Sequence, residues 1–296
     1  MSMMLLTGAS GFLGGEIIKT LGAAKIKTLS RHNADYIADL RNEVPILNET
    51  FETVIHAAGK AHMIPKTPEE KQDFFNVNLQ GTQNLLTALE KSGLPQHFVL
   101  ISTVAVYGAE SGTLINEDSP LRASDPYGQS KIEAENLVTE WVNKHKVTLT
   151  ILRLPLLAGP NPPGNLKSMI NGIKKGYYFN IAGGKAKKSM VLAVDVASII
   201  PITAPIGGTY NLTDGCHPSF HELSALIAQQ VGKSIPNNIP AFMARLMALA
   251  GDIIGKKSPI NSDKLKKIMS DLTFDDAKAR KLLGWQPTPV LKGLKL

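Results

Sequence analysis

Tyr127 and Lys131 are the side chains whose types and spacing in this sequence best suit acid–base chemistry. They follow Asp125-Pro126, which is typical of a helix start, so both should lie on one face of one helix. A phenol with a pKa of about 10 exchanges protons poorly at neutral pH. We expect the Lys131 ammonium to lower the pKa of Tyr127, so that the phenol can move a proton at a hydroxyl or carbonyl. By itself, a pair with this spacing is also common on helix surfaces.

A further hydroxyl could act on the same substrate oxygen. Ser102-Thr103 ends a run of apolar and β-branched residues that predicts a strand. The Thr103 hydroxyl could donate or accept a hydrogen bond at the reacting oxygen. Thr103, Tyr127 and Lys131 are therefore the candidate catalytic residues.

A glycine-rich turn supplies the candidate cofactor site. The segment Thr7-Gly8-Ala9-Ser10-Gly11-Phe12-Leu13-Gly14 follows the first predicted strand and opens the first predicted helix. Glycine lets the backbone turn tightly and approach a pyrophosphate, whose charge the exposed N–H groups and the helix dipole favour. The pattern predicts dinucleotide binding through residues 8–14, and a tight turn without a ligand is the alternative.

The end of the second predicted strand indicates which dinucleotide would bind. NAD sites usually place an acidic residue there for the ribose 2′-hydroxyl, and NADP sites place a basic one. This chain has Leu29-Ser30-Arg31-His32-Asn33, with no acid. Ser30 and Arg31 could hold a 2′-phosphate, because arginine offers planar bidentate donors. We therefore favour NADP(H), with NAD(H) as the alternative and a solvated surface arginine as the non-functional interpretation.

These residues need a fold that brings them to one edge of a sheet. The first half of the chain alternates β-branched runs with longer helical patterns, which implies parallel βαβ units. Right-handed crossovers then favour an α/β fold with a Rossmann-like, doubly wound parallel sheet. We predict strands at 3–6, 26–29, 53–56, 98–102 and 148–152, and helices within 12–23, 68–92 and 126–146.

The second half is less regular and predicts a smaller, mixed C-terminal substrate domain. Residues 208–212 could return to the sheet, and Ser219 to Glu222 has the spacing of a capping box. We assign residues 1–158 and about 190–214 to the dinucleotide-binding domain, and residues 159–189 and 215–296 to the substrate-binding domain. The apolar stretch 239–254 predicts an amphipathic helix, with contact to a membrane surface as the lesser alternative.

Composition narrows the classes of function. The chain has 296 residues, 43 % of them hydrophobic and 19 % charged, and a net charge of +7 that suits anionic ligands. We expect no nucleic-acid partner, because the basic clusters lack interleaved aromatic residues. We also expect no metal and no membrane span, because neither ligand spacing nor about 20 consecutive apolar residues occur. A single cysteine, Cys216, and no evident signal peptide favour a cytoplasmic location.

The motifs together resemble those of the extended short-chain dehydrogenase/reductases, in the NAD-dependent epimerase/dehydratase family. The resemblance rests on Thr7-Gly8-x-x-Gly11-x-x-Gly14, His56-Ala57-Ala58-Gly59, Asn78-x-x-Gly81-Thr82, Ser102-Thr103 and Tyr127-x-x-x-Lys131, along nearly the whole chain. It implies a Ser/Thr–Tyr–Lys catalytic set with Thr103 in the first position. Besides the glycine-rich turn, Ser30 and Arg31, it implies cofactor contacts from Asp39, Leu40, Ala57, Ala58, Gly59, Asn78, Tyr127, Lys131 and Pro155.

Within that family, the sequence is similar to bacterial nucleotide-sugar 4-epimerases and 4-keto-sugar reductases of surface-polysaccharide synthesis. The likeness lies in Leu152-Arg153-Leu154-Pro155, Ala158-Gly159-Pro160, Gly164-Asn165 and Leu283-Gly284-Trp285-Gln286-Pro287-Thr288. It implies a nucleotide-sugar substrate, often a homodimer, and substrate contacts from His62, Ser102, Asn165 and Lys188.

Two departures from the family pattern narrow the reaction. Sugar-nucleotide 4,6-dehydratases carry Asp-Glu after the catalytic threonine, whereas this chain has Val104-Ala105, which cannot do acid–base work. Leu156 stands where many members have asparagine, which argues against close identity with UDP-galactose 4-epimerase.

The leading hypothesis is an NAD(P)-dependent oxidoreductase that acts at C4 of a nucleotide-diphosphate sugar. Arg31 favours a 4-keto-sugar reductase slightly over a 4-epimerase, because a reductase releases oxidised cofactor and suits NADPH. The alternatives from other classes are a non-catalytic dinucleotide-binding sensor or scaffold, and a reductase of a non-nucleotide ketone.

Overall fold

The computed structural model describes residues 3–61, 63, 65–254 and 260–296. Its centre is a seven-stranded sheet in the order β11-β7-β5-β4-β1-β2-β3, and every pair of neighbours is parallel. The strands are β1 (Met4–Thr7), β2 (Ile26–Ser30), β3 (Tyr36–Ile37), β4 (Thr53–His56), β5 (His97–Thr103), β7 (Thr148–Leu154) and β11 (Gly208–Asn211). The predicted doubly wound parallel sheet is confirmed, and its order reverses between β1 and β4.

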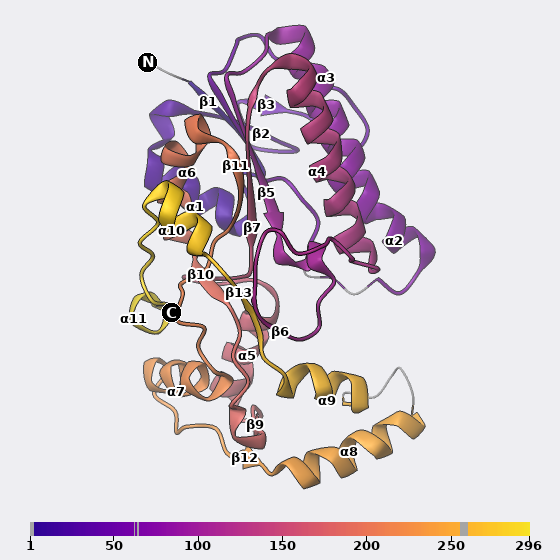
Figure 1. The fold of residues 1–296 in the computed structure, drawn as a ribbon, viewed down its shortest axis with the longest axis vertical. Coiled ribbons are helices and arrows are strands. Elements are labelled where there is room, and N and C mark those ends of the chain that lie inside the picture. Colours follow the sequence, from indigo (N-terminus) through magenta and orange to yellow (C-terminus); the bar gives the residue numbers. More distant parts are fainter. Residues whose placement is uncertain (1–2, 62, 64, 255–259) are drawn as a thin grey trace.

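Helices cover both faces of the sheet (Figure 1). One face packs against α1 (Phe12–Leu21) and α6 (Ala193–Ile206), and the other against α3 (Gly81–Ser92) and α4 (Pro126–His145). Alternate residues of each strand enter the two cores, so that Ile55 and Val99 face one layer while Val54 and Phe98 face the other. Such two-sided burial explains why the predicted strands are almost continuously apolar.

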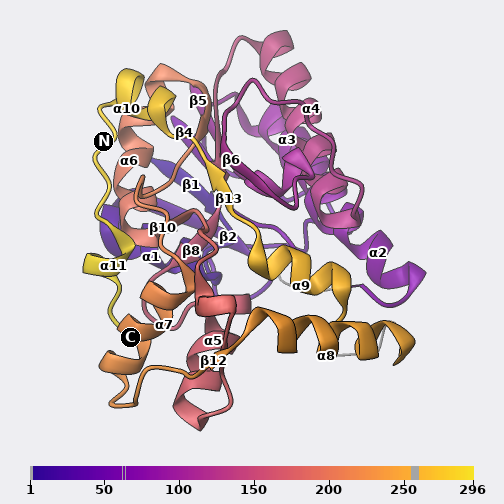
Figure 2. The same cartoon turned by 60° about the horizontal axis from the view of Figure 1, so that its bottom comes forward.

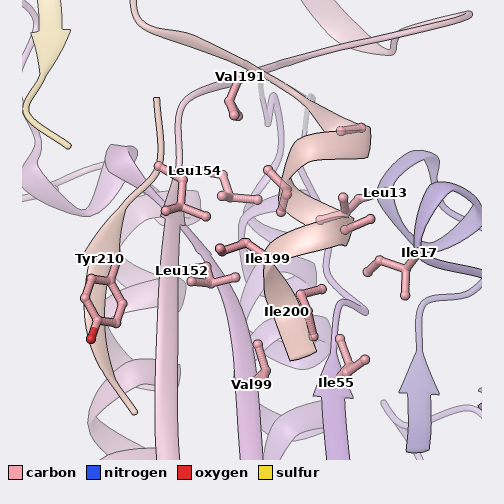
Figure 3. Packing of buried hydrophobic residues seen from close by; sticks show 14 of the residues in the cluster. Leu13, Ile17, Ile55, Val99, Leu152, Leu154, Val191, Ile199, Ile200 and Tyr210 are labelled. Carbon is pink, nitrogen blue, oxygen red and sulfur yellow. The ribbon is translucent and has the colours of Figure 1, made fainter. Parts of the chain in front are cut away.

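Figure 3 shows the first of these cores from close by. Ile17 of α1 and Ile200 of α6 point toward the strand residues Ile55, Val99 and Leu152. Ile17, Ile55, Val99, Ile200 and Leu152 are all fully buried. The core therefore fixes α1, and with it the glycine-rich turn, against the middle of the sheet.

The single helical pattern over 68–92 is interrupted in the structure. Helix α2 (Pro68–Phe75) passes into a π-helical turn, η2 (Asn76–Gln80), before α3 begins. Single π-turns inside helices often occur at functional sites. Here the turn carries Asn78, whose side chain is buried.

Most of the rest of the chain forms short strand pairs and helices at the end of the sheet shown at the bottom of Figure 1, whereas α10 (Ala277–Leu283) lies beside α1 and α6 along the sheet. The pairs are β8 (Leu156–Ala158) with β10 (Met190–Leu192), β9 (Asn180–Ile181) with β12 (Asn238–Ile239), and β6 (Gly112–Ile115) with β13 (Leu272–Phe274). The helices are α5 (Gly164–Lys175), α7 (Phe220–Gln230), α8 (Ala241–Ile254), α9 (Ser262–Met269), α10 and α11 (Val290–Gly293). The capping box of Ser219 and Glu222 is present at the start of α7.

Two segments differ from the expected division of the chain. Ala279, Leu283 and Trp285, within the range assigned to the substrate domain, are buried in the core between α1, α6 and the sheet. Strand β6, within the range assigned to the nucleotide domain, pairs with β13. In both cases, contact between the two predicted domains buries apolar side chains of the C-terminal elements, such as Leu283 and Phe274.

Two features of the described residues are the length of their helices and the grouping of their acidic, histidine and cysteine side chains. None of these helices has the length and apolar composition needed to cross a bilayer. Over the same part of the chain, no group of three or more His, Cys, Asp or Glu side chains could hold a metal ion.

Candidate active site

The glycine-rich turn lies where the strand order reverses, the usual ligand position in open α/β sheets. Gly8 has a φ of +74°, and a Cβ there would lie 2.6 Å from the Ala57 carbonyl carbon and the Ala58 nitrogen. A Cβ on Gly14 would lie 2.1 Å from the Gly8 oxygen. Both glycines are therefore required by the close approach of backbone segments. No side chain caps the first turn of α1, so its N–H groups can receive an anion.

A cavity of about 740 Å³ opens beside this turn. Ten of the predicted cofactor residues line it, namely Gly8, Ser10, Gly11, Ser30, Arg31, Asp39, Leu40, Ala57, Ala58 and Gly59. The remaining seven, Phe12, Leu13, Gly14, Asn78, Tyr127, Lys131 and Pro155, are not among its lining residues. Leu13 is buried in the core beneath the turn, and Gly14 packs on Gly8, so these two support the turn.

Charged side chains gather at the β2 end of the cavity. Arg31 is exposed, while Arg41 donates two hydrogen bonds from Nε and Nη2 to the Asp39 carboxylate at 3.0 and 2.5 Å. Arg41 and then Arg31 hold the pKa of Asp39 below its usual range, so the carboxylate is ionised at neutral pH. The sequence interpretation missed Arg41, although its position two residues after Asp39 was a usable signal. The Ser30 hydroxyl donates to the His32 carbonyl and shapes this turn.

The three candidate catalytic residues come together at the C-terminal end of β5. The Asp125 carboxylate accepts hydrogen bonds from the N–H groups of Tyr127 and Gly128, both at 3.1 Å, and so caps α4 as predicted. The Thr103 hydroxyl lies beside the Tyr127 phenol and influences its pKa. Thr103 Oγ1 accepts a hydrogen bond from the Ala105 N–H at 3.1 Å, so its own proton remains available for a hydrogen bond to a ligand.

The pKa shift of Tyr127 beside Lys131 differs from the one that the sequence predicted. Burial raises the pKa of Tyr127, and the neighbouring Thr103 hydroxyl lowers it less. Burial lowers the pKa of Lys131 to about 8, and the nearby Glu135 carboxylate opposes that shift. Lys131 Nζ donates to the Ile101 carbonyl at 2.7 Å. The pKa of Tyr127 is thus raised, whereas the sequence predicted that it would be lowered. The reason is that desolvation of the phenol dominates, while the Lys131 ammonium is bonded to the β5 backbone.

A substrate contact from Ser102 would require an open surface, but Ser102 is buried. Its hydroxyl donates to Glu135 Oε1 at 2.5 Å, and it is 4 % exposed. Arg153 Nη2 in turn donates to Glu135 Oε2 at 2.7 Å, and its Nη1 donates to the Tyr107 hydroxyl at 3.1 Å. Successive strand residues face opposite sides, so Thr103 faces the site while Ser102 faces this network.

Asn78 holds the cofactor loop in place without lining the cavity. Its Oδ1 accepts from the Lys60 N–H at 2.7 Å, and its Nδ2 donates to the Lys60 carbonyl at 3.2 Å and to Ser130 Oγ at 2.9 Å. The segment after Gly59 is thereby tied to α4. The expected cofactor contact of Asn78 is replaced by a supporting role, since its amide is fully used.

His56 joins β4 to its neighbours as a neutral ring. Burial lowers the pKa of His56 to about 3. Thr82 Oγ1 donates to the Asn78 carbonyl at 2.6 Å, so it accepts from His56 Nε2 at 2.9 Å. The other ring nitrogen, Nδ1, then accepts from Thr7 Oγ1 at 2.7 Å, and Thr7 Oγ1 accepts from the Ala58 N–H at 3.1 Å. His56 therefore ties β4 to β1 and to α3.

The remaining predicted substrate residues have mixed outcomes. Lys188 Nζ donates to the carbonyls of Lys267 and Ser270 at 3.1 and 2.9 Å, so it caps the end of α9 instead of facing a diphosphate. Asn165 is exposed in the first turn of α5. His62 lies outside the described residues. Pro155 directly follows β7, whose last residue Leu154 is paired with Thr103, so Pro155 lies at the same edge as the catalytic set.

A doubly wound sheet with a glycine-rich turn at its switch point defines a dinucleotide-binding class of α/β fold. A family model described as the NAD dependent epimerase/dehydratase family matches residues 4–211. The chain belongs to this family, within the extended short-chain dehydrogenase/reductases.

Relatives of known name extend over almost the whole chain. N-acetyl-alpha-D-glucosaminyl-diphospho-ditrans,octacis-undecaprenol 4-epimerase of Escherichia coli O157:H7 is 29 % identical, covering 98 % of this chain and 92 % of the relative. UDP-glucose 4-epimerase of Vibrio cholerae is 26 % identical with the same two coverages, 98 % and 92 %. GDP-6-deoxy-D-mannose reductase of Pseudomonas aeruginosa is 33 % identical over 47 % of this chain and 46 % of the relative.

Solved structures share the fold. MoeE5 in complex with UDP-glucose and NAD superposes with a TM-score of 0.75 at 20 % identity, covering 99 % of this chain and 96 % of that one. RMD from Pseudomonas aeruginosa, complexed with NADPH, gives a TM-score of 0.71 at 23 % identity, with coverages of 98 % and 96 %. The relatives together support an NAD-dependent enzyme of the oxidoreductase and epimerase kind.

Proposed function

We propose that this chain is an NADP(H)-dependent oxidoreductase that reduces the C4 carbonyl of a sugar carried on a diphosphate. The observation that carries the proposal is the meeting of the half-buried Tyr127 phenol with Thr103 and Lys131 at the C-terminal end of β5. Because its pKa is raised, the phenol is protonated at neutral pH and suits a general acid. Reduction of a carbonyl needs such an acid, whereas oxidation of a hydroxyl needs the phenolate.

The residues would divide the reaction as follows. When bound, the nicotinamide cofactor supplies a hydride to C4 of the sugar. Tyr127 gives its phenolic proton to the oxygen on C4, so that the C=O bond becomes a C–H and an O–H bond. The Thr103 hydroxyl would donate its one proton to that oxygen and orient it for proton transfer. Lys131, with a pKa of about 8, is mostly protonated at neutral pH and favours the phenolate as it forms. Solvent then restores the phenolic proton.

The preference for NADP(H) rests on the charges around Asp39. An ionised carboxylate in the cavity would repel a 2′-phosphate, but Arg41 already neutralises it with a two-point contact. Arg31 makes no hydrogen bond with any described residue and lines the same part of the cavity. We propose that Arg31 binds the 2′-phosphate and that Arg41 masks Asp39.

The proposed substrate has a sugar, a diphosphate and a carrier. A nucleoside carrier follows from the resemblance of the sequence to nucleotide-sugar enzymes, and we propose a role in surface-polysaccharide synthesis on the same basis. The Escherichia coli relative instead has a polyprenol as the carrier in its name. Asn165 remains a proposed substrate contact, because it is exposed at the N-terminus of α5, where a diphosphate would be favoured. Both carriers present the same diphosphate to this position.

A 4-epimerase is the second candidate, because the two relatives above that match over the full length are 4-epimerases. Both reactions share hydride and proton transfer at C4. An epimerase would keep its cofactor bound and return the hydride to the other face of the sugar.

Cofactor turnover distinguishes these functions. The purified protein is mixed with NADPH or NADH and a UDP-4-keto-sugar, and absorbance of the reduced cofactor is followed while products are separated by chromatography. Consumption of one NADPH per sugar reduced supports the reductase. Interconversion of UDP-sugars without net cofactor change supports the epimerase instead. A third outcome is that the protein binds cofactor but catalyses neither reaction, and that no nucleoside diphosphate raises its Tm. This outcome would leave only a sensor or a reductase of a different ketone.

A further inference from the structure

Helix α8 exposes nearly all of its apolar side chains. Seven large ones are between 47 % and 89 % exposed, namely Phe242, Met243, Leu246, Met247, Leu249, Ile253 and Ile254. Helices of globular proteins normally bury their apolar stripe, and monomers rarely expose large continuous apolar patches. We call this set the apolar face of α8.

The contact that holds α8 to the molecule is narrow. Its buried residues are Ala244, Ala248 and Gly251, at i, i+4 and i+7, and the two alanines pack with Leu265 of α9. Four residues with the same helical spacing lie on the opposite side and point outward, namely Phe242, Leu246, Leu249 and Ile253. Small residues thus face the protein and large residues face away from it. This arrangement is the reverse of a helix that contributes to a core.

We propose that the apolar face of α8 lies in the headgroup region of an anionic lipid bilayer and docks the enzyme on a membrane surface. A helix of 14 residues is about 21 Å long at 1.5 Å per residue, which suits lying in the interface better than crossing about 30 Å of hydrocarbon. Helices with a continuous apolar face and basic residues beside it bind to bilayers in this way. Docking at a membrane goes beyond the proposed reaction and does not depend on it.

Charge beside the apolar face supports an anionic surface. The adjoining helix α9 carries exposed Lys264, Lys266 and Lys267, and α8 itself carries exposed Arg245. Lys267 is paired with Glu110, but both side chains are more than half exposed, so the pair is weak. Together, α8 and α9 carry four basic side chains and two acidic ones, and the whole chain has a net charge of +7. Anionic headgroups complement this excess.

A bilayer fits the face better than a second copy of the chain does. Protein interfaces carry about one hydrogen bond per 100–200 Å². The apolar face offers Phe, Met, Leu and Ile side chains, with no polar group among its seven residues. The helix also lies at the outer end of the molecule, with α9 between it and the sheet, so a flat surface can reach it (Figures 1 and 2).

The pair of helices is fixed to the substrate side of the molecule. Asp252 of α8 accepts from the Ser262 N–H at 3.0 Å at the start of α9. At the other end of α9, Lys188 Nζ donates to the carbonyls of Lys267 and Ser270. Lys188 precedes β10, which is paired with β8 just beyond the catalytic edge. A membrane bound to α8 would therefore have a defined orientation relative to the site.

Vesicle sedimentation tests the proposal. The full-length protein is mixed with sucrose-loaded vesicles of phosphatidylcholine with phosphatidylglycerol, or of phosphatidylcholine alone. We expect binding to the anionic vesicles that weakens in high salt. The variant Leu246→Glu/Ile253→Glu should need at least about tenfold more lipid for half-binding, because two apolar side chains that would enter the bilayer are lost. The matched control Ile46→Glu/Ile206→Glu changes two exposed isoleucines elsewhere and should bind like the wild type.

A second variant protects the test against misfolding. Leu249→Trp keeps the face apolar, and the native Trp141 and Trp285 are buried, so a vesicle-induced blue shift would report on α8 alone. The proposal is overturned if the wild type does not sediment with anionic vesicles, if both double variants lose binding equally, or if Leu249→Trp shows no shift. It is also overturned in favour of a second copy if the wild type is a dimer without lipid affinity and Leu246→Glu/Ile253→Glu is a monomer.

Discussion

Replacing Glu135 by glutamine removes one charge from the buried network next to the candidate catalytic threonine. The Glu135 and Arg153 side chains are only 4 % and 8 % exposed, and Arg153 Nη2 donates to Glu135 Oε2 at 2.7 Å. Glutamine has nearly the same volume but only one acceptor oxygen, and its NH2 group cannot accept from Arg153 or from Ser102. The Arg153 guanidinium would therefore stay buried without a neutralising charge.

The loss of stability can be estimated from this geometry. Removing one partner of a buried ion pair costs about 3–5 kcal/mol, because the remaining charge is uncompensated. Arg153 keeps its hydrogen bonds to the Tyr107 hydroxyl at 3.1 Å and to the Glu117 carbonyl at 3.4 Å, which places Glu135→Gln at the lower end. We expect a loss of about 3 kcal/mol, or a fall in Tm of about 5 °C for a chain of this size.

The same substitution has a second expected effect, on the pH dependence of activity. Burial lowers the pKa of Lys131 to about 8, and the Glu135 carboxylate raises it. Removing the carboxylate should lower the Lys131 pKa below 8. If protonated Lys131 supports proton transfer from Tyr127, activity falls as pH rises through this pKa. The variant should then lose activity at a lower pH than the wild type does.

Thermal and urea unfolding measure the first effect, and a pH–rate profile with NADPH measures the second. Glu133→Gln is the matched control, since Glu133 is exposed on the same helix and the charge change is identical. We expect the control to stay within about 0.5 kcal/mol of the wild type. If Glu135→Gln shifts stability no more than Glu133→Gln does, the reasoning from buried charge is refuted. An unchanged basic limb of the profile would refute the link between Glu135 and Lys131.

Three further substitutions test the catalytic and cofactor assignments. Tyr127→Phe should lower kcat by about 10²–10⁴ with little change in the Kd for NADPH, and an unchanged kcat would exclude the phenol as the proton donor. Arg31→Ala should weaken NADPH binding about 10–100-fold in a fluorescence titration, the value of one charge-assisted hydrogen bond, and leave NADH binding unaffected. Equal losses for both cofactors would contradict a 2′-phosphate contact. Gly14→Ala should abolish cofactor binding, because its Cβ would lie 2.1 Å from the Gly8 oxygen, whereas Gly15→Ala meets nothing within 4 Å and should bind normally. Equal behaviour of the two alanine variants would show that the turn can relax.

Patterns local in the sequence predicted the fold well. The strands at 53–56 and 148–152 appear as β4 and the first part of β7, because runs of β-branched and apolar residues follow from burial on both faces. The π-helical turn over Asn76–Gln80 could not be predicted, since no proline or glycine interrupts the pattern there. Its cause is tertiary, because Asn78 bonds to the Lys60 backbone and to Ser130.

Side-chain partners far apart in sequence explain the failed site assignments. Ser102 and Lys188 have side chains suited to a sugar or a diphosphate, and nothing near them in the sequence says otherwise. In the fold, Ser102 meets Glu135 and Lys188 meets the end of α9, and both are used before any ligand arrives. The positions of Thr103 and Tyr127 follow from a strand end and a helix start, which local patterns do define, and the structure has β5 end at Thr103 and α4 begin at Pro126.

One stripe of α4 connects the chemistry to the stability of the fold. Tyr127, Lys131 and Glu135 stand at i, i+4 and i+8, so they share one face of the helix. This face runs along the end of β5, where Tyr127 lies beside Thr103, Lys131 donates to the Ile101 carbonyl and Glu135 accepts from Ser102. The motif that identified the first two residues continues by one more helical turn to the third. Glu135 lies within the buried network behind the catalytic residues. It nevertheless anchors the strand that presents the Thr103 hydroxyl, and it raises the pKa of Lys131.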